Sequence, residues 1–278
     1  VTNSVGNSVI VDPWSFDWEG DDFHLPALNE SVIYEAHVGS FFAEDGAGNF
    51  AMMGEKLQHV VDLGCNVIQI MPVAEFAGDL SWGYNPAHIF AVESAYGGPT
   101  AYREFVKQAH RMGLGVIQDV VYNHFGPSDL DLWQFDGWSD NGKGGIYFYN
   151  DHRSATPWGD TRPDYGRAEV RRFIHDNALM WLREFRVDGL RYDMTPYMRS
   201  VDATGFDIID GWTLQGWVNR DIREEFPGAL LIAEDMHSNP LVTGFEDDGA
   251  GYHAQWDPNF VHPVRKALQE YDDAHRNI

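Results

Sequence analysis

Cysteine is almost absent from this chain. Cys65 is the only one among 278 residues, so no disulfide can form within the chain. Its apolar neighbours predict a small buried side chain rather than a nucleophile, and a chain without disulfides suits a reducing compartment. Positive charge is also scarce. Nineteen Lys and Arg face 43 Asp and Glu, and the formal charge of -24 disfavours nucleic acid and anionic membrane surfaces as partners.

Long apolar runs and leader-like segments are missing too. No stretch approaches the roughly 18 apolar residues that a membrane-spanning helix requires, and the amino terminus lacks a basic region followed by an apolar one. We therefore expect a cytoplasmic protein with no membrane partner. The chain begins at Val1, in a polar stretch, so we expect it to be a processed form or a piece of a longer polypeptide.

Short apolar, β-branched runs alternate with segments that have helical spacing. Near-continuous apolar runs are typical of parallel strands covered on both faces, and their alternation with helices favours right-handed βαβ units. No G-x-G-x-x-G or G-x-x-x-x-G-K-[ST] motif follows a predicted strand, which disfavours a nucleotide-binding open sheet. The expected fold class is therefore α/β, a (β/α)8 TIM-type barrel. The expected strands are 32–38, 67–73, 115–122, 189–194 and 229–236, and the expected helices are 52–63, 100–112, 168–185 and 212–226.

One connection is much longer than the others and divides the predicted barrel. Residues 125–166, rich in Gly, Asp, Trp and Tyr, separate the third strand from its helix, and loops of this length are usually functional or form small subdomains. We therefore expect four parts. Residues 1–29 are the tail of a preceding module with a linker, 30–124 the first part of the barrel, 125–166 an insertion, and 167–278 the continued barrel.

Ionisable side chains follow three consecutive predicted strands. Asp119 to His124 end the third strand, Arg191 and Asp193 the fourth, and Glu234 the fifth. The active site of such a barrel lies at the carboxyl ends of its strands, so these groups should meet at one rim. Taken singly, each residue is more often a loop cap or a solvated side chain. Their coincidence on successive strands is what indicates a site.

Enzymes that cleave a glycosidic bond with retention use two carboxyl groups on either side of that bond. A carboxylate about 5 to 5.5 Å from a protonated partner attacks the anomeric carbon while the partner protonates the leaving oxygen. Arg191 lies two residues from Asp193 and is expected to keep the pKa of Asp193 low, as an ionised nucleophile needs. Glu234 follows Ala233, faces another carboxylate, and suits the role of the acid.

These strand ends resemble the first three sequence signatures of the α-amylase superfamily, glycoside hydrolase family 13. The matching segments are Asp119–His124 (DVVYNH), Gly189–Asp193 (GLRYD) and Ile232–Asp235 (IAED), in that order along the chain. Trp82–Pro86 (WGYNP) after the second strand and the long insertion after the third strand, which is similar to the family's domain B, agree with this. The resemblance covers roughly residues 30–260, and the motifs are jointly highly specific.

The resemblance implies a retaining enzyme that acts on α-1,4/α-1,6-glucans without a cofactor. Asp193 is implied as the nucleophile and Glu234 as the general acid and base, with Arg191 orienting Asp193. Some family members ligate calcium through the Asn at position 123, but the insertion has no acidic cluster to complete such a site, so no metal is expected. The substrate-binding side chains that the resemblance implies are His124 and Tyr84, which hold and stack the sugar, Trp82, and the supporting Asp119 and Asn123.

Within the family, three further segments resemble the branching-enzyme and maltooligosyl-trehalose trehalohydrolase group: Tyr34–Gly39 (YEAHVG), Tyr122–Pro127 (YNHFGP) and Thr156–Gly159 (TPWG). Its members carry a β-sandwich module before the barrel, and residues 1 to about 20 are expected to be the last strand of that module. We expect a glucan-branching or amylase-like enzyme, with trehalohydrolase as the alternative. An inactive amylase-like scaffold is the alternative from another class. A metal-dependent barrel hydrolase is disfavoured because His37 stands alone on the first strand.

The sequence departs from the family at its carboxyl-terminal part. The fourth signature, a His-Asp at the end of the seventh strand that supplies the third carboxylate, follows a sixth strand. Residues 252–257 are expected to be that sixth strand and residues 264–271 its helix. The barrel is therefore expected to be truncated after about six strand–helix units, with the remaining strands in a longer parent chain.

Overall fold

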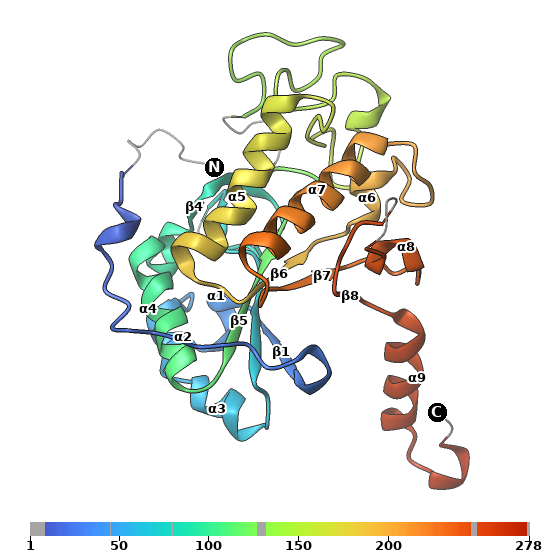
Figure 1. The fold of residues 1–278 in the computed structure, drawn as a ribbon. Helices are drawn as coiled ribbons and strands as arrows, with labels where there is room; N and C mark the ends of the chain where they lie inside the picture. The colour runs from blue at the N-terminus through green and yellow to red at the C-terminus, as the bar shows by residue number, and fades with distance from the viewer. Residues whose placement is uncertain (1–8, 45, 79, 127–131, 246–248, 277–278) are drawn as a thin grey trace.

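The computed structural model describes residues 9–44, 46–78, 80–126, 132–245 and 249–276. Its main feature is a twisted sheet in which every neighbouring pair of strands is parallel (Figure 1). The strands lie side by side in chain order, which is the arrangement of a barrel rather than of a doubly wound sheet. Across the sheet they are β1 (Ile33–Ala36), β2 (Val67–Ile70), β5 (Gly115–Val120), β6 (Gly189–Tyr192), β7 (Leu230–Ala233) and β8 (Ala254–Gln255).

Helices connect these strands and cover the outer face of the sheet (Figure 1). The longest, α5, spans the eighteen residues Ala168–Phe185, as its stripe of apolar residues predicts. The other α-helices in the described residues are α1 (Val38–Phe41), α2 (Phe50–Gly54), α3 (Leu57–Asp62), α4 (Gly98–Arg111), α6 (Pro196–Arg199), α7 (Ile209–Glu225), α8 (Pro240–Thr243) and α9 (Pro258–Gln269).

The two faces of the sheet carry different side chains because successive residues of a strand point to opposite sides. On β5, Val116 and Val120 join the large core shared with the helices, whereas Ile117 packs in a small inner cluster with Val67 and Leu230. Asp119 lies two residues after Ile117 and therefore points to the same inner side. The inner face thus changes from apolar to charged toward the carboxyl ends of the strands.

The predicted α/β fold with six strand–helix units is confirmed, but some helix bounds differ from the prediction and one pair of strands was not predicted. The helix expected over 52–63 is split into α2 and α3, because Lys56 adopts a non-helical conformation with φ -109° and ψ 4°. An unexpected antiparallel pair, β3 (Ala74–Phe76) and β4 (Pro86–Val92), follows β2 and forms its own small sheet. This pair folds back because the Trp82–Pro86 segment turns the chain between two short runs.

The insertion after β5 is held against the barrel by buried polar contacts. The fully buried guanidinium of Arg162 donates to the carbonyl oxygens of Ser200 and Ala155 at 2.7 and 2.6 Å. The Tyr165 hydroxyl donates to the carbonyl of Tyr122 at 2.7 Å. Residues 127–131, including Pro127 of the predicted motif, lie outside the described residues. The described part contains isolated β-bridges and a short 3-10 helix over His152–Ser154.

The amino-terminal segment runs beneath the barrel and is tied to it at His110. Residues 9–20 contain a 3-10 turn at Pro13–Ser15 and no strand, while residues 1–8 of the predicted module tail lie outside the described residues. The two ring nitrogens of His110 contact the carboxylates of Asp21, at 2.7 Å, and Asp188, at 2.9 Å. Burial opposes a charge on His110, but hydrogen bonds and charge from Asp188 and Asp21 outweigh it and raise the pKa of His110.

Replacing His110 with Gln is expected to destabilise the protein more at pH 6 than at pH 9. Because the pKa of His110 is raised in the folded state, its full contribution to the free energy of unfolding is present below its ordinary pKa of about 6.5. This contribution is lost as the pH rises through the raised pKa of the folded state. Urea unfolding of wild type and variant at both pH values measures the difference. His59→Gln, at an exposed position, is the matched control. Equal destabilisation at both pH values would contradict the ion-pair role.

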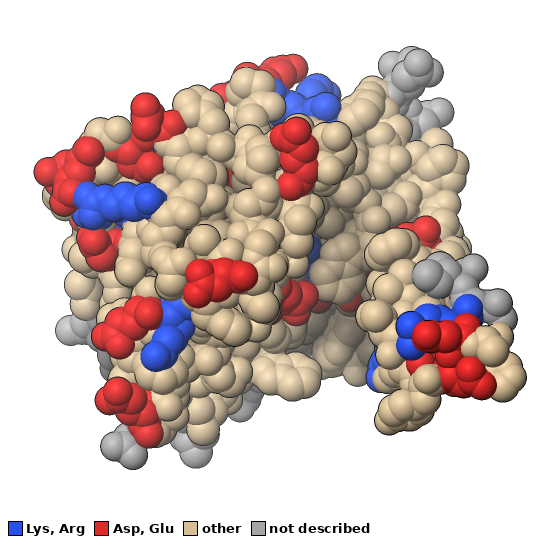
Figure 2. All heavy atoms as spheres, turned by 90° about the horizontal axis from the view of Figure 1, so that it is seen from below, with Lys and Arg blue, Asp and Glu red and all other residues tan. Residues whose placement is uncertain are grey.

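Seen from below, the surface carries Asp and Glu side chains interspersed with fewer Lys and Arg (Figure 2). A hollow separates the α9 helix from the rest of the molecule in this view.

The α9 helix is largely exposed. Phe260, Val261 and Leu268 of α9 are exposed, and Ala267 is its only buried residue. Within the described part of the chain, no helix is both long enough and apolar enough to cross a membrane.

Candidate active site

The register of the sheet places the predicted catalytic side chains in two layers on its inner face. Asp119 pairs with Arg191 across β5 and β6, and Arg191 pairs with Ile232 across β6 and β7. Side chains that are paired in register point the same way, and so do residues two positions further along each strand. Asp193 and Glu234 therefore follow as the next layer, at the carboxyl ends of adjacent strands.

Arg191 is the centre of this cluster and contacts all three acidic side chains. Its Nη1 atom lies 2.7 Å from Oδ2 of Asp119 and 3.2 Å from Oδ1 of Asp193. Its Nη2 atom lies 2.6 Å from Oε2 of Glu234. The guanidinium is 2% exposed, so these are strong, charge-assisted contacts in a poorly hydrated setting. Both predicted catalytic carboxylates thus bind the two terminal nitrogens of one cation.

One guanidinium cannot neutralise three carboxylates, of which Asp119 and Asp193 are buried and Glu234 is half-buried. Burial raises the pKa of Asp119 to about 7, although Arg191 opposes the shift. Burial and the neighbouring Asp119 also raise the pKa of Asp193 well above its ordinary value. The expectation of a low pKa for Asp193 is therefore wrong, because burial and the charge of Asp119 outweigh the effect of the shared Arg191. Raised pKa values on two neighbouring carboxyl groups are typical of acid–base sites.

The cluster forms the floor of an open cavity of about 670 Å³. Such a volume is in the range of small-molecule sites. Three predicted substrate-binding residues, Tyr84, His124 and Trp82, line it together with Arg191 and Asp193. The other lining residues are Glu35, His37, Ser40, Met71, Trp158, Met194, Glu234 and Trp256.

Tyr84 is positioned by the turn that precedes it. Gly83 has φ +88°, and a Cβ atom there would lie 2.2 Å from the Pro72 carbonyl oxygen, so the backbone requires glycine. The Tyr84 hydroxyl donates to Oδ2 of Asp119 at 2.8 Å, which fixes the ring against the acidic cluster. Trp82, on the other side of the turn, is 70% exposed at the cavity rim.

His124 supports an aromatic wall of the cavity. Burial lowers the pKa of His124 to about 4, so its imidazole is neutral near pH 7. Its ring stacks on Trp158 with centroids 4.6 Å apart and planes 14° apart. Trp158 comes from the insertion and is 46% exposed. The sequence motif therefore brings a strand-end histidine and an insertion tryptophan together as one surface.

Asn123 is engaged with the predicted nucleophile rather than with a metal. Its amide nitrogen donates to Oδ2 of Asp193 at 2.7 Å and to the Asp193 carbonyl at 2.8 Å, and its oxygen faces Nδ1 of His124. Calcium requires six to eight oxygen ligands. In the part of the chain that the structure describes, no group of three His, Cys, Asp or Glu side chains converges on a cation position.

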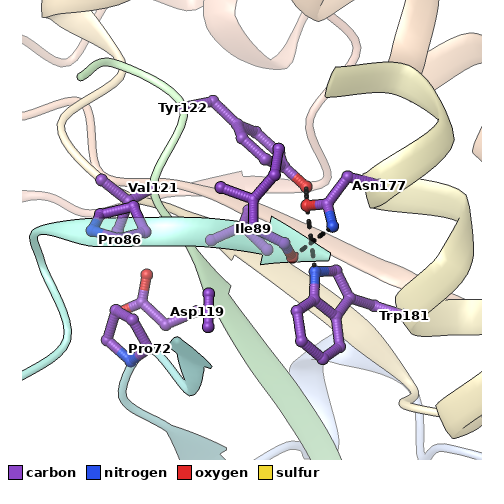
Figure 3. Close-up of a pocket in the computed structure, with 10 residues that line it drawn as sticks. Pro72, Pro86, Ile89, Asp119, Val121, Tyr122, Asn177 and Trp181 are labelled. Atoms are coloured by element: carbon purple, nitrogen blue, oxygen red, sulfur yellow. Dashed lines mark hydrogen bonds between the residues drawn. The ribbon is translucent and has the colours of Figure 1, made fainter. Parts of the chain in front are cut away.

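The cluster is supported from behind by the β4 strand and the α5 helix (Figure 3). Asn177 of α5 accepts hydrogen bonds from the Tyr122 hydroxyl, at 2.7 Å, and from Nε1 of Trp181, at 3.2 Å. Its own amide donates to the Ile89 carbonyl at 2.6 Å. The void that they enclose beside Asp119 is only about 10 Å³. Such tight packing explains why Asp119 is buried from water on this side.

Sequence reasoning missed two contacts of the cluster. The guanidinium carbon of Arg191 lies 4.4 Å from the ring centroid of Trp256, a favourable cation–π distance. Trp256 directly follows the sixth strand of the sheet, so the rule that site residues lie at the carboxyl ends of strands could have identified it. Met194 has φ +38°, and its backbone N–H donates to Oε2 of Glu234 at 3.0 Å. Strained backbone of this kind persists where surrounding structure enforces it, and no sequence signal predicts it.

Comparison with known proteins gives matches over nearly the whole chain. Residues 39–134 match the model of the alpha-amylase catalytic domain. The chain is 38% identical to a malto-oligosyltrehalose trehalohydrolase of Deinococcus radiodurans, over 95% of this chain and 40% of that protein. It is 35% identical to a 1,4-alpha-glucan branching enzyme of Nitratidesulfovibrio vulgaris, over 91% of this chain and 41% of that protein.

A solved structure agrees with these sequence matches. A protein of Salmonella typhimurium assigned as an alpha amylase superposes with a TM-score of 0.77 and 31% identity, over 94% of this chain and 42% of the other. The chain thus spans about 40% of the length of the relatives it matches.

The parallel sheet in chain order, with an insertion after its third strand, is part of an α/β barrel of the amylase type. With the matches above, the chain belongs to the α-amylase superfamily.

Proposed function

We propose that the protein containing this chain is a retaining glycosidase or glucanotransferase acting on α-1,4/α-1,6-glucans, and most closely a branching or amylase-like enzyme. The observation that carries the proposal is the sharing of Arg191 by Asp193 and Glu234 on the floor of an open cavity. Two carboxylates held beside each other at the rim of a barrel are what double displacement at an anomeric carbon requires.

The first half of the reaction uses Asp193 and Glu234 in opposite roles. Asp193 attacks the anomeric carbon and forms a glycosyl–enzyme ester, while the protonated Glu234 gives its proton to the leaving glycosidic oxygen. Arg191 and Asn123 fix the two oxygens of Asp193, at 3.2 and 2.7 Å. Attack by a carboxylate so restrained needs little reorganisation.

The second half returns both groups to their starting states. Glu234, now ionised, removes a proton from water or from a sugar hydroxyl, and that oxygen displaces Asp193 from the anomeric carbon. Water gives hydrolysis, and a 6-hydroxyl of another chain gives a branch. Tyr84 and the wall formed by His124 and Trp158 offer aromatic faces to the apolar side of the sugar rings.

Strands outside this chain are proposed to close the barrel of the whole protein. β1 pairs only with β2, and β8 pairs only with β7, so each leaves one edge without a strand in the described residues. Val32 and Ile33 beside the β1 edge are 52% and 37% exposed. Unpaired parallel edges favour association. We propose residues 30–124 and 167–278 as barrel, 125–166 as insertion, and 1–29 as linker and module tail.

Trehalose release is a second candidate function, because the first matched relatives carry that name and align over nearly the whole chain. The two outcomes share the catalytic pair and differ in the acceptor and leaving group. Product analysis separates them. We expect the whole protein to form α-1,6 branches or short oligosaccharides from amylose, and free trehalose from a trehalose-ended maltooligosaccharide would favour the second candidate.

Retention itself is the direct test of the proposal. Proton NMR during the first minutes on a maltooligosaccharide is expected to detect the α-anomer as the first product, because two inversions at the anomeric carbon restore its configuration. Asp62→Asn, at an exposed site on α3, serves as the matched control and should behave as wild type. First release of the β-anomer would contradict the mechanism, and no turnover of any glucan would favour the inactive scaffold.

A further inference from the structure

A buried ion pair lies directly behind Glu234 and has no part in the reaction described above. Arg199 ends the α6 helix, which begins three residues after Asp193, and Asp235 follows Glu234 in the chain. The Nε and Nη2 atoms of Arg199 each lie 3.2 Å from Oδ2 of Asp235. Their side chains are 2% and 1% exposed. Burying two charges costs desolvation free energy, and the pair repays this cost only where its geometry is good and further hydrogen bonds satisfy both groups.

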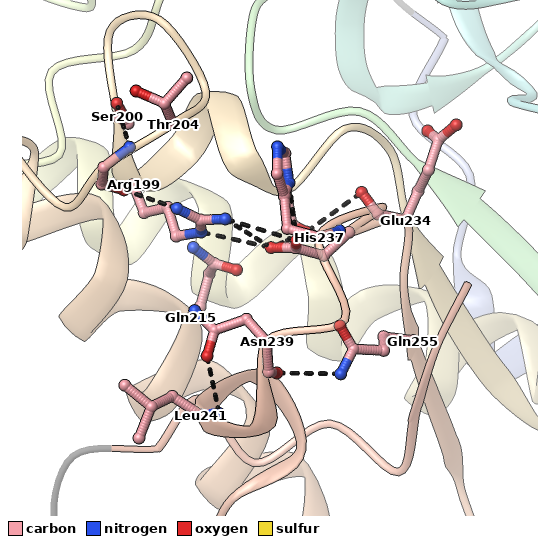
Figure 4. Close-up of polar contacts among 12 residues, drawn as sticks. Arg199, Ser200, Thr204, Gln215, Glu234, His237, Asn239, Leu241 and Gln255 are labelled. Carbon is pink, nitrogen blue, oxygen red and sulfur yellow. Dashed lines mark hydrogen bonds and ion pairs between the residues drawn. The ribbon is translucent and has the colours of Figure 1, made fainter. Parts of the chain in front are cut away.

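Further contacts join the same two segments. Thr195 donates to the Glu234 carbonyl through both its backbone N–H and its hydroxyl, each at 3.2 Å. The backbone N–H of His237 donates to Oδ1 of Asp235 at 3.3 Å. Figure 4 shows Arg199 reaching across to the segment that carries Glu234 and His237. The chain after β6 and the chain after β7 are thus held together by polar contacts away from the cavity.

These contacts restrain the position of Glu234, the proposed acid, more than that of Asp193, the proposed nucleophile. The carboxylate of Asp193 has its own partners in Arg191 and Asn123. The carboxylate of Glu234 is held by Arg191 and by the backbone N–H of Met194, which lies in the segment that Arg199 ties down. Loosening the Arg199–Asp235 pair therefore frees the Glu234 segment while leaving Asp193 restrained.

We propose that Arg199 and Asp235 are positioning residues that hold the Glu234 carboxyl within reach of the leaving glycosidic oxygen. This inference rests on the proposed function. Proton donation demands hydrogen-bond reach of about 2.6–3.2 Å, and a misplacement of about 1 Å can cost two powers of ten in rate. The pair acts through the backbone of residues 234 and 235 and touches no substrate.

The leaving group provides a readout that a merely structural role would not move. Fluoride departs without protonation, whereas a sugar hydroxyl needs the acid. For Asp235→Asn in the whole protein, we expect kcat on a maltooligosaccharide to fall about 30- to 100-fold. Its kcat/KM on the α-glycosyl fluoride of the same oligosaccharide reports only the first step, in which fluoride leaves without an acid, and should stay within about threefold of wild type.

Two further variants keep the test decisive if Asp235→Asn folds poorly. Arg199→Lys keeps the charge but loses the two-atom contact, and Thr195→Val loses the hydroxyl bonds to the Glu234 carbonyl and to Oδ2 of Asp235. Both should repeat the pattern with smaller losses, about tenfold and about fivefold on the oligosaccharide. The remote pair of Arg103 and Glu184 is the matched control, and Glu184→Gln should leave both rates unchanged.

Equal losses on both substrates, or none on either, would overturn the positioning role of Arg199 and Asp235. A wild-type protein that turns over neither substrate would instead contradict the proposed function. The two failures are therefore distinguishable.

Discussion

Replacing Asp193 with Asn is expected to lower kcat on α-glucans by on the order of 10⁴-fold, about 5 kcal/mol of transition-state stabilisation. The amide keeps the shape of the carboxylate but cannot attack the anomeric carbon. Asn123 and Arg191 remain in place around it. Steady-state kinetics of the whole protein measure the loss, and calorimetric titration with a maltooligosaccharide should give a Kd within about threefold of wild type.

A chemical rescue sharpens this assignment. Asp193→Ala leaves space beside the anomeric carbon, and we expect azide to restore turnover of an α-glycosyl fluoride by forming a β-glycosyl azide. The product is inverted because only one displacement occurs. Asp62→Asn again provides the control, since Asp62 accepts a hydrogen bond from Gln58 on an exposed helix face. Trapping of a covalent glycosyl intermediate on another residue would disprove the role of Asp193.

Replacing Arg191 with Met is expected to abolish activity and to lower the free energy of unfolding by about 3–5 kcal/mol, the cost of leaving buried charges without their partner. Three carboxylates lose their common cation, and the raised pKa values of Asp119 and Asp193 rise further. Any residual kcat/KM should therefore have its acid limb at higher pH, because Asp193 must be ionised to attack. Urea unfolding and a pH–rate profile measure the two effects.

An exposed arginine tests whether the effect is specific to the buried cluster. Arg183 pairs with Glu225 on the surface, and its side chain is 45% exposed. Arg183→Met should cost at most about 1 kcal/mol and leave the pH profile unchanged. If Arg191→Met retained activity within about tenfold of wild type, the shared cation would not be central to the site.

The strands that carry the site were predictable because their signal is local. Runs such as 115–122 begin at a glycine and are rich in β-branched apolar residues, which is typical of buried parallel strands. Since consecutive strands of such a barrel are neighbours, Asp119, Arg191 and Glu234 had to share one rim. The structure confirms that arrangement through the register of β5, β6 and β7.

Other features depend on neighbours that are distant in the sequence. The helical spacing over 52–63 is continuous, yet the chain turns at Lys56. Propensity is a weak prior that tertiary packing overrides. The β3–β4 pair joins Ala74 to Val92 across a turn that demands glycine at position 83. Which short segments pair as strands depends on their tertiary contacts, and the hydrophobic periodicity of each segment does not predict its partner.

The sequence by itself determined the α/β class, the order of the strands and the residue types at their carboxyl ends, because each follows from local pattern and chain connectivity. Only the tertiary structure decided that the guanidinium of Arg191 contacts three carboxylates at once. Arg191 is two residues from Asp193 and also binds Asp119 and Glu234, while burial and the charge of Asp119 raise the pKa of Asp193 against the effect of Arg191. Burial and shared charge depend on all groups within a few ångströms, and those groups come from three strands.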